Sequence, residues 1–273
     1  MSPKKEGVGG VFCVKGGCYT RGMAIPKKIW QTCNFEEEQI PDYIEVMRRT
    51  WMDRNPGWEY EYMSERKAVE FLEEHYGPDR VDAYLGLSKG ALKGDYWRFH
   101  CIAKFGGVYA DIDAVCSEPL DSWIDVAKSF IGFKEFDGNG RYTFCSWLFA
   151  SSTEAPWMSE IADIVHDRVF NSKKTADGNF YTASMDETYF SFVNYMQDLE
   201  STDEFLKNSS VFEQADAHRL VWHKSSSWDH CENDSEFREI PESYYWDCGD
   251  NVNLKIYNDS YSSVSFPGKF ERG

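Results

Sequence analysis

An alternation of strand-like and helix-like segments, separated by Gly and Pro, is the feature that most constrains how this chain folds. Ile25 to Thr32 mixes β-branched and aromatic residues, as strands do, whereas Glu36 to Asp53 repeats apolar residues at helical spacing. The alternation continues with a strand at 58–63, a helix from an N-cap at Ser64 to about 76, a helix at about 89–105 and a strand at 108–115. Because strands that alternate with helices form layered sheets, we expect an α/β fold.

Further segments extend this main domain and leave two terminal regions outside it. Strands are predicted at 129–134 and 142–151, and helices at 156–170 and about 185–199. Residues 1–23 are rich in Gly and Lys without an apolar period, which predicts a flexible N-terminal arm. Residues 236–273 are polar and rich in turn residues, which predicts a C-terminal extension packed on or near the domain. The main domain is therefore expected over 24–235.

A strong negative charge restricts the partners of the chain. Lys and Arg number 29 against 46 Asp and Glu, which gives a formal net charge of −17 at pH 7. Such a chain repels phosphate backbones and anionic membrane surfaces, so we expect no nucleic-acid partner. An anionic small ligand would need cations gathered at one place, supplied by a divalent metal, a few Arg or Lys side chains, or helix N-termini.

The hydrophobicity of the chain bears on its location. No apolar run reaches the roughly 18 to 20 residues that span a bilayer, and the opening residues lack the apolar core of a signal peptide. We therefore expect no membrane span and a cytoplasmic location. Three glycosylation sequons, at Asn208, Asn233 and Asn258, keep open the alternative of a lumenal domain whose anchor has been removed.

The segment GGVYADID, which ends in Asp111 and Asp113, carries the strongest chemical signal. Two carboxylates two residues apart on an extended strand point to the same side, where both can approach one hard cation on a diphosphate. In the preceding predicted helix, Asp95 and Arg98 lie on one face and can pair with each other or present both charges to a ligand. The plainer interpretations are a solvated strand end and an ordinary intrahelical ion pair.

Three segments, in this order, resemble glycosyltransferase family 32: IPKKIWQT at 25–32, ALKGDYWR at 91–98 and FGGVYADID at 105–113. That family includes the fungal initiating α-1,6-mannosyltransferase and bacterial sugar transferases with a D-x-D motif. The resemblance implies a GT-A fold, a Rossmann-like domain with a mixed central sheet flanked by helices. It also implies Mn²⁺ or Mg²⁺ on the donor diphosphate and retention of the anomeric configuration.

The resemblance also implies roles for individual residues. Asp111 would contact the ribose or metal-bound water, and Asp113 would ligate the metal directly. Asp95 and Arg98 would line the donor site, and Arg98 would help to stabilise the leaving group. Tyr109, in the D-x-D segment, is included among the predicted donor-binding residues.

Other candidates lie at the first strand and in the predicted helix near residue 185. Gln31 and Thr32, at the end of the first strand, would lie against the nucleobase and ribose by the same resemblance. Asp186, a predicted catalytic residue, and Glu187 are candidates for acceptor or sugar contacts. Carboxylates in a first helical turn also stabilise the helix dipole, which is the plainer interpretation of this pair.

The segment VWHKSSSW resembles the closing motif of such retaining transferases. A neutral imidazole is a suitable ligand for Mn²⁺, so His223 is predicted as a third metal ligand, with a surface histidine as the alternative. Lys224 would contact a phosphate, and Ser227 and Trp228 would help to close over the donor. The Gly often found before Ser-Trp is replaced by Ser226, so the loop conformation does not transfer from the family.

These observations predict a metal-dependent, retaining glycosyltransferase that moves a hexose from a UDP- or GDP-sugar to a glycan or other hydroxyl acceptor. Same-face attack is favoured over a covalent glycosyl-enzyme because no carboxylate stands out as a buried nucleophile. The alternatives are a metal-dependent phosphohydrolase or nucleotidyltransferase, which also clusters Asp at strand ends, and a non-catalytic sugar-binding domain. Residues 144–149 depart from the family pattern, so acceptor specificity does not transfer.

Overall fold

The fold is known from a computed structural model of the 273-residue chain. It describes residues 11–14, 17–20, 24–40, 42–87, 90–136, 142–153, 155–170, 195–196, 198, 203–213 and 220–222.

A mixed β-sheet forms the centre of the fold. Its strands are β3 (Lys28–Thr32), β4 (Glu59–Met63), β5 (Gly107–Ala110), β7 (Phe130–Phe136), β8 (Tyr142–Phe144), β9 (Leu148–Ser151) and β10 (Ser209–Phe212). They run in the order β10-β7-β9-β5-β3-β4, and β8 pairs with β7 beside this path. β3 is parallel to β4 and β5, whereas β9 is antiparallel to β5 and β7. The mixed sheet is the one that the predicted fold requires.

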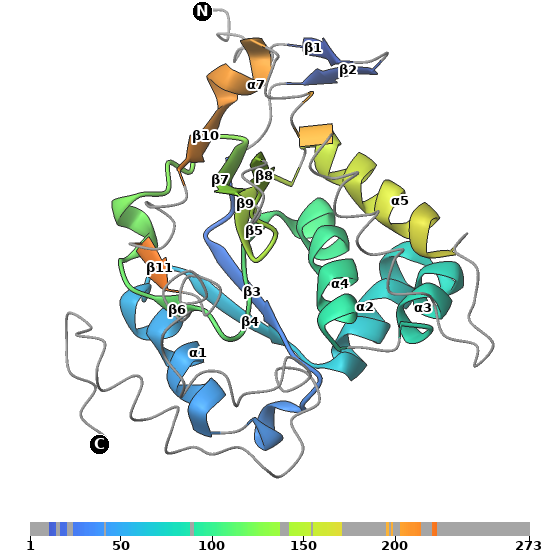
Figure 1. Cartoon of the computed structure of the whole chain (residues 1–273), viewed down its shortest axis with the longest axis vertical. Coiled ribbons are helices and arrows are strands. Elements are labelled where there is room, and N and C mark those ends of the chain that lie inside the picture. The colour runs from blue at the N-terminus through green and yellow to red at the C-terminus, as the bar shows by residue number, and fades with distance from the viewer. Residues whose placement is uncertain are drawn as a thin grey trace, which may run out of the picture.

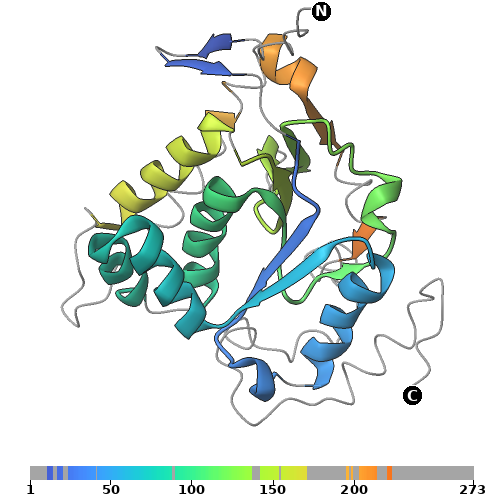
Figure 2. The same ribbon diagram turned by 180° about the vertical axis from the view of Figure 1, so that it is seen from behind.

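Helices cover both faces of this sheet. They are α1 (Asp42–Arg54), α2 (Glu65–Tyr76), α3 (Pro78–Leu85), α4 (Gly90–Phe105), α5 (Pro156–Phe170) and the short α7 (Asp203–Asn208), with single 3-10 turns η1 (Glu37–Gln39) and η2 (Leu120–Ser122). Figures 1 and 2 show α2 to α5 gathered on one side of the sheet and α1 on the other. The prediction of an α/β fold with a mixed central sheet flanked by helices is confirmed.

Alternating side chains of the central strands build a core on each face. In β5, Tyr109 packs against Trp97 of α4 on the side of helices α2 to α5. Its neighbours Val108 and Ala110 point to the opposite face, where they join the core that contains Trp51 of α1. β5 is therefore buried from both sides, as its apolar sequence predicts.

Two glycines allow β5 to enter the sheet. Gly106 and Gly107 have φ of +62° and +97°, a backbone conformation that L side chains rarely adopt. A Cβ on Gly107 would lie 2.6 Å from the carbonyl oxygen of Lys28, and one on Gly106 would lie 2.8 Å from that of Ser151. Trp30 Nε1 donates to the Gly106 carbonyl at 2.9 Å and closes this turn. The Gly-Gly pair of the D-x-D segment is thus explained by strand packing.

Helices α2 and α3 follow each other with a single residue between them. Ser64 Oγ accepts a hydrogen bond from the Lys67 N–H at 3.4 Å and caps α2, as predicted. Gly77, with φ of +88°, ends α2. Pro78 occupies the first turn of α3, where its missing N–H is harmless. The helix predicted from Ser64 to about 76 is thus followed by α3, which the sequence did not predict.

The strand predicted over 108–115 is wrong beyond Ala110. Asp111 to Ala114 form a turn in which the Ala114 N–H donates to the Asp111 carbonyl at 3.0 Å. The chain then resumes as the short strand β6 (Val115–Cys116), which pairs antiparallel with β11 (Val221–Trp222). The two aspartates therefore lie in a turn, and the argument from strand alternation does not apply to Asp113.

Two other regions bear on the predicted domain boundaries. Within the predicted arm, β1 (Val11–Val14) and β2 (Gly17–Thr20) pair as an antiparallel hairpin that the sequence did not predict. Most of the helix predicted at 185–199 and all residues beyond 222 lie outside the described residues. The division into a domain over 24–235 and an extension over 236–273 stays a prediction.

Candidate active site

The topology of the sheet places a crevice at the carboxyl ends of β3 and β5. From β3 the chain crosses through α1 to β4 on one side, and then through α2 to α4 to reach β5 on the other side of β3. Where adjacent parallel strands send their connections in opposite directions, a crevice opens outside their carboxyl ends, and open α/β sheets bind ligands there. Asp111 is the first residue after β5, so the D-x-D motif stands at this point.

Asp111 is held by two side chains on the side of the sheet that carries helices α2 to α5. Its Oδ1 accepts a hydrogen bond from Tyr109 Oη at 2.6 Å and lies 3.1 Å from Arg98 Nη2. The same Nη2 lies 2.6 Å from Asp95 Oδ1, so a single guanidinium serves both carboxylates. The predicted ion pair between Asp95 and Arg98, three residues apart on α4, is present. Arg98 also supports the D-x-D motif through its contact with Asp111.

The guanidinium of Arg98 is buried and surrounded by acceptors. Its Nε donates to the carbonyl of Gly94 at 3.3 Å, and its Nη1 donates to the carbonyl of Ser146. The guanidinium carbon lies 4.7 Å from the centre of the Tyr109 ring. Because its side chain is only 3% exposed, Arg98 acts on the site chiefly through Asp111.

Electrostatics fix the protonation states of Arg98 and Tyr109. Burial alone would lower the pKa of Arg98, but the charge of Asp111, with smaller contributions from Tyr109 and Asp95, raises it above its ordinary value. Burial raises the pKa of Tyr109, so the phenol keeps the proton that it donates to Asp111. Burial also raises the pKa of Asp95, and the nearby Arg98 opposes that rise. Arg98 is thus permanently charged and Tyr109 permanently a donor.

Ile112 determines how the turn sits on the fold. It is 3% exposed and packs in a cluster with Ile44 and Met47 of α1 and Tyr62 of β4. On either side of it, Asp111 and Asp113 are only partly buried. Burial of Ile112 therefore anchors the centre of the motif, while the carboxylates on either side of it stay partly accessible.

Gln31 and Thr32 end β3, as predicted, and their side chains turn into the protein. Gln31 is completely buried, and its Nε2 donates to the carbonyl of Asp111 at 2.8 Å. Thr32 is 4% exposed, and its Oγ1 donates to the carbonyl of Met63 at 2.8 Å. Both side chains are engaged inside the protein, and the contact of this strand end with a nucleobase and ribose stays a prediction.

The remaining predicted residues lie outside the described part of the chain. They are Asp186, Glu187, His223, Lys224, Ser227 and Trp228. Among the described residues, no group of three or more His, Cys, Asp or Glu side chains is arranged to hold a metal ion. The metal site thus stays a prediction that combines Asp111 and Asp113 with the undescribed His223.

Sequence reasoning missed the backbone part of the site. The segment before β9 supplies the Ser146 carbonyl to Arg98, and the Trp147 carbonyl accepts from the Asp111 N–H at 2.9 Å. Main-chain acceptors leave no mark in side-chain patterns. The Tyr109 hydroxyl was within reach of prediction, because residues two apart at a strand end share one face.

The middle of the chain matches a known family. Residues 41–130 match the family described as glycosyltransferase sugar-binding region containing DXD motif. This segment includes Asp95, Arg98, Asp111 and Asp113. The predicted resemblance to D-x-D glycosyltransferases is confirmed as a match over this segment.

Two fungal relatives illustrate the likeness. The initiation-specific alpha-1,6-mannosyltransferase of Candida albicans is 28% identical over 171 residues, which cover 55% of this chain and 44% of the relative. The putative glycosyltransferase HOC1 of Saccharomyces cerevisiae is 25% identical over 173 residues, covering 57% and 43%. The chain therefore spans less than half the length of each of these two curated relatives.

A solved structure, described as PaToxG glycosyltransferase, is also similar. It is 14% identical with a TM-score of 0.44, and the match covers 89% of this chain and 87% of that one. A TM-score at this level adds nothing to the assignment of the fold.

In the part of the chain that the structure describes, no helix combines the length and apolar character needed to cross a membrane.

Proposed function

We propose that this chain, whose residues 41–130 match the sugar-binding region of D-x-D glycosyltransferases, transfers a hexose from a UDP- or GDP-sugar to a hydroxyl acceptor. The acceptor is a glycan or another hydroxyl compound. Transfer depends on Mn²⁺ or Mg²⁺ and retains the anomeric configuration. The Candida albicans relative is named an initiation-specific alpha-1,6-mannosyltransferase, so mannose is the first hexose to test.

One observation carries this proposal. The D-x-D motif lies at the carboxyl end of β5, and its first carboxylate is held by Arg98 Nη2 at 3.1 Å and Tyr109 Oη at 2.6 Å. A carboxylate fixed at such a point is suited to a polar ligand that arrives from the open end of the sheet. A merely solvated strand end would not need a buried arginine to hold it.

The residues present fit a divalent cation. Arg98 is shared between Asp95 and Asp111, and Asp113 adds a third carboxylate two residues further on. An anionic diphosphate would be repelled by this group unless a cation lay between them. Mg²⁺ on nucleotides commonly takes one or two protein carboxylates and completes its shell with phosphate and water, and such a site needs no larger protein cluster. When bound, the cation would neutralise the charge that grows on the leaving diphosphate.

The residues of the chain supply orientation and charge for this step. Asp113 would hold the cation, and Asp111, locked by Arg98 and Tyr109, would accept hydrogen bonds from donor hydroxyls. Because Arg98 is almost fully buried, its role is to orient Asp111 and to balance its charge. We further propose same-face attack, in which the departing phosphate takes the acceptor proton, since no carboxylate among the described residues stands apart as a nucleophile.

A thermal-shift screen tests the proposal. The purified chain is heated with GDP-mannose, UDP-glucose, UDP-galactose or UDP-N-acetylglucosamine, each with and without Mn²⁺, because binding raises the melting temperature by mass action. We expect a metal-dependent rise with one nucleotide and slow release of free sugar from that donor. Release of phosphate in place of sugar would indicate a phosphohydrolase. Binding without any turnover, even with hydroxyl acceptors, would indicate a non-catalytic sugar-binding domain.

A further inference from the structure

We propose that Arg48 and Tyr60 are positioning residues of the donor site, acting through a hydrogen-bond relay that ends on the carbonyl of Asp111. The inference rests on the proposed function, because it concerns the same turn. It adds two residues, from α1 and β4, to the determinants of that site.

The relay runs through three side chains on three elements. Arg48 Nε donates to Tyr60 Oη at 3.2 Å, and Tyr60 Oη donates to Gln31 Oε1 at 2.8 Å. Gln31 Nε2 then donates to the Asp111 carbonyl at 2.8 Å. That carbonyl also accepts from the Ala114 N–H at 3.0 Å, the bond that closes the D-x-D turn. The relay therefore joins α1, β4 and β3 to the turn.

The two ends of the relay determine the direction of every bond in it. Arg48 has only donors, and a backbone carbonyl has only acceptor lone pairs. Tyr60 must accept from Arg48, so its single proton points to Gln31. Burial raises the pKa of Tyr60, which keeps that proton in place. The Gln31 amide is then oriented with its oxygen toward Tyr60 and its NH₂ group toward Asp111.

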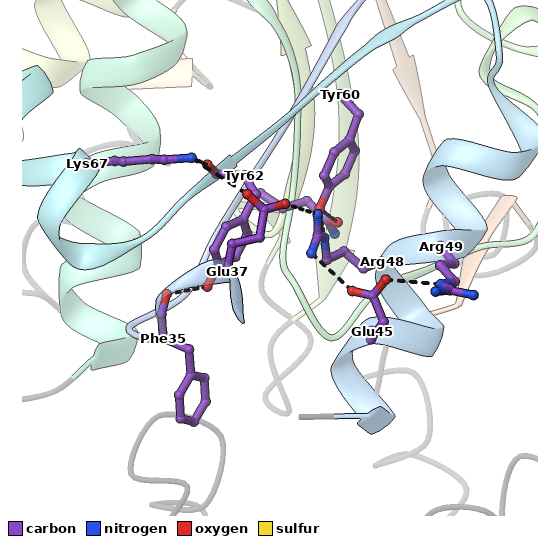
Figure 3. Close-up of polar contacts among 9 residues, drawn as sticks. Phe35, Glu37, Glu45, Arg48, Arg49, Tyr60, Tyr62 and Lys67 are labelled. Atoms are coloured by element: carbon purple, nitrogen blue, oxygen red, sulfur yellow. Dashed lines mark hydrogen bonds and ion pairs between the residues drawn. The ribbon is translucent and has the colours of Figure 1, made fainter. Parts of the chain in front are cut away.

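The starting point of the relay is itself immobilised. Arg48 is 7% exposed. Its Nη2 lies 2.6 Å from Glu37 Oε1, and its Nη1 lies 3.0 Å from Glu45 Oε2. Its guanidinium carbon lies 5.3 Å from the ring centre of Tyr60 and 5.1 Å from that of Tyr62. Figure 3 shows the guanidinium enclosed by these side chains. An arginine held on several sides is a rigid donor for the hydroxyl of Tyr60.

Breaking the relay should loosen the turn without removing any group from the site. Tyr60→Phe keeps the ring that faces Arg48 and deletes only the hydroxyl. The Gln31 amide then loses the bond that sets its orientation, and in the flipped state its oxygen opposes the Asp111 carbonyl. The turn in that state is held by the Ala114 N–H without support from β3.

Isothermal titration of Mn²⁺ with UDP, and separately with GDP, measures the effect without turnover. We expect Tyr60→Phe to raise the Kd of the Mn²⁺–nucleotide about tenfold at unchanged stoichiometry, the scale of one buried hydrogen bond. General destabilisation would lower the stoichiometry and leave the Kd of the folded fraction unchanged. Gln31→Met, which keeps a similar length but has no hydrogen-bond donor, should raise the Kd further.

Tyr76→Phe is the matched control. Tyr76 Oη donates to the His100 carbonyl at 2.7 Å in the helical layer, so this variant also deletes one hydroxyl that bonds inside the protein. Its Kd should equal that of the wild type. Amide exchange of the Ala114 N–H, followed by NMR on ligand-free protein, should be about tenfold faster in Tyr60→Phe and unchanged in Tyr76→Phe.

The outcomes separate the inference from the proposed function. If the wild type binds neither nucleotide with Mn²⁺, the proposed function fails, and the positioning role in a donor site fails with it. If the wild type binds but Tyr60→Phe has the same Kd and the same Ala114 exchange, the relay is refuted while the function stands. Equal losses in Tyr60→Phe and Tyr76→Phe would also refute the relay.

Discussion

Replacing Gly107 by Ala tests the account of how β5 enters the sheet. The φ of Gly107 is +97°, and a Cβ there would lie 2.6 Å from the Lys28 carbonyl oxygen and 3.1 Å from Trp30 Nε1. The strained backbone contributes about 1–3 kcal/mol of destabilisation, and forcing an extra methyl group into a packed site about as much again. We expect the free energy of unfolding to fall by about 4 kcal/mol, a large part of the about 5–15 kcal/mol typical of a domain.

Two other glycines separate these contributions. Gly77 has φ of +88° with nothing within 4 Å of the place where a methyl group would lie, so Gly77→Ala carries the backbone contribution alone. Gly57 has neither a positive φ nor a neighbour within 4 Å, so Gly57→Ala should be close to neutral. Urea unfolding followed by circular dichroism should rank the midpoints Gly57→Ala, Gly77→Ala, Gly107→Ala from highest to lowest at constant m. A Gly107→Ala midpoint equal to that of Gly77→Ala would refute the steric argument.

Three further predictions concern the site and its supports. Asp113→Ala should lower kcat by about 100-fold or more, because a bound metal stabilises the transition state by several kcal/mol. Its melting temperature should stay close to that of the wild type. Full activity of this variant in a transfer assay would contradict the metal assignment. Burial lowers the pKa of His100 from 6.5 to about 3, so between these values the unfolded chain binds the extra proton and stability falls as the pH falls. The free energy of unfolding should change by about 1 kcal/mol per pH unit in this range. His100→Phe should therefore flatten the dependence of the urea midpoint on pH between pH 6.5 and 4.5. An unchanged dependence would exclude His100 as its source. Asn55 Oδ1 accepts a hydrogen bond from the Leu120 N–H at 2.7 Å in a buried site. Asn55→Ala should therefore lower the free energy of unfolding, measured with urea, by about 2 kcal/mol. If the loss were smaller than that of the exposed control Asn34→Ala, this prediction would be wrong.

Local patterns predicted α4 and α5 well, missed α3, and misplaced the start of α1 and the end of β5. Helix α5 has the predicted bounds of 156–170, and α4 begins one residue after the predicted start at 89, because apolar spacing and flanking Gly and Pro are local signals. The strand predicted over 108–115 continued too far because VYADIDAV contains no Gly or Pro that would end it. What bends the chain is the Asp111 carbonyl, which accepts from Ala114 and from Gln31, and Gln31 lies 80 positions earlier. A contact at that separation is invisible to a local pattern.

In the candidate site, too, some features could be predicted from the sequence and others could not. The Asp95–Arg98 pair follows from helical spacing, and the metal-binding role of the D-x-D motif was inferred from composition and resemblance. That Arg98 turns to Asp111, and that Gln31 is buried beneath it, depends on how α4 and β3 pack against β5. The inward orientation of the Gln31 and Thr32 side chains was not predicted, because a polar residue at a strand end can face a ligand or the protein, and residue type alone does not distinguish the two.

The backbone acceptors around Arg98 have a consequence for how this site tolerates variation. Gly94 and Ser146 contact the guanidinium through their carbonyl oxygens, and Trp147 holds the Asp111 N–H in the same way. Any side chain that preserves the path of the main chain preserves these bonds. Of residues 144–149, where the sequence departs from the family pattern, all but Ser146 are buried in the core, so free variation is confined to the Ser146 side chain. A substitution there changes the side chain beside Arg98 and leaves in place the main-chain acceptor that Arg98 uses.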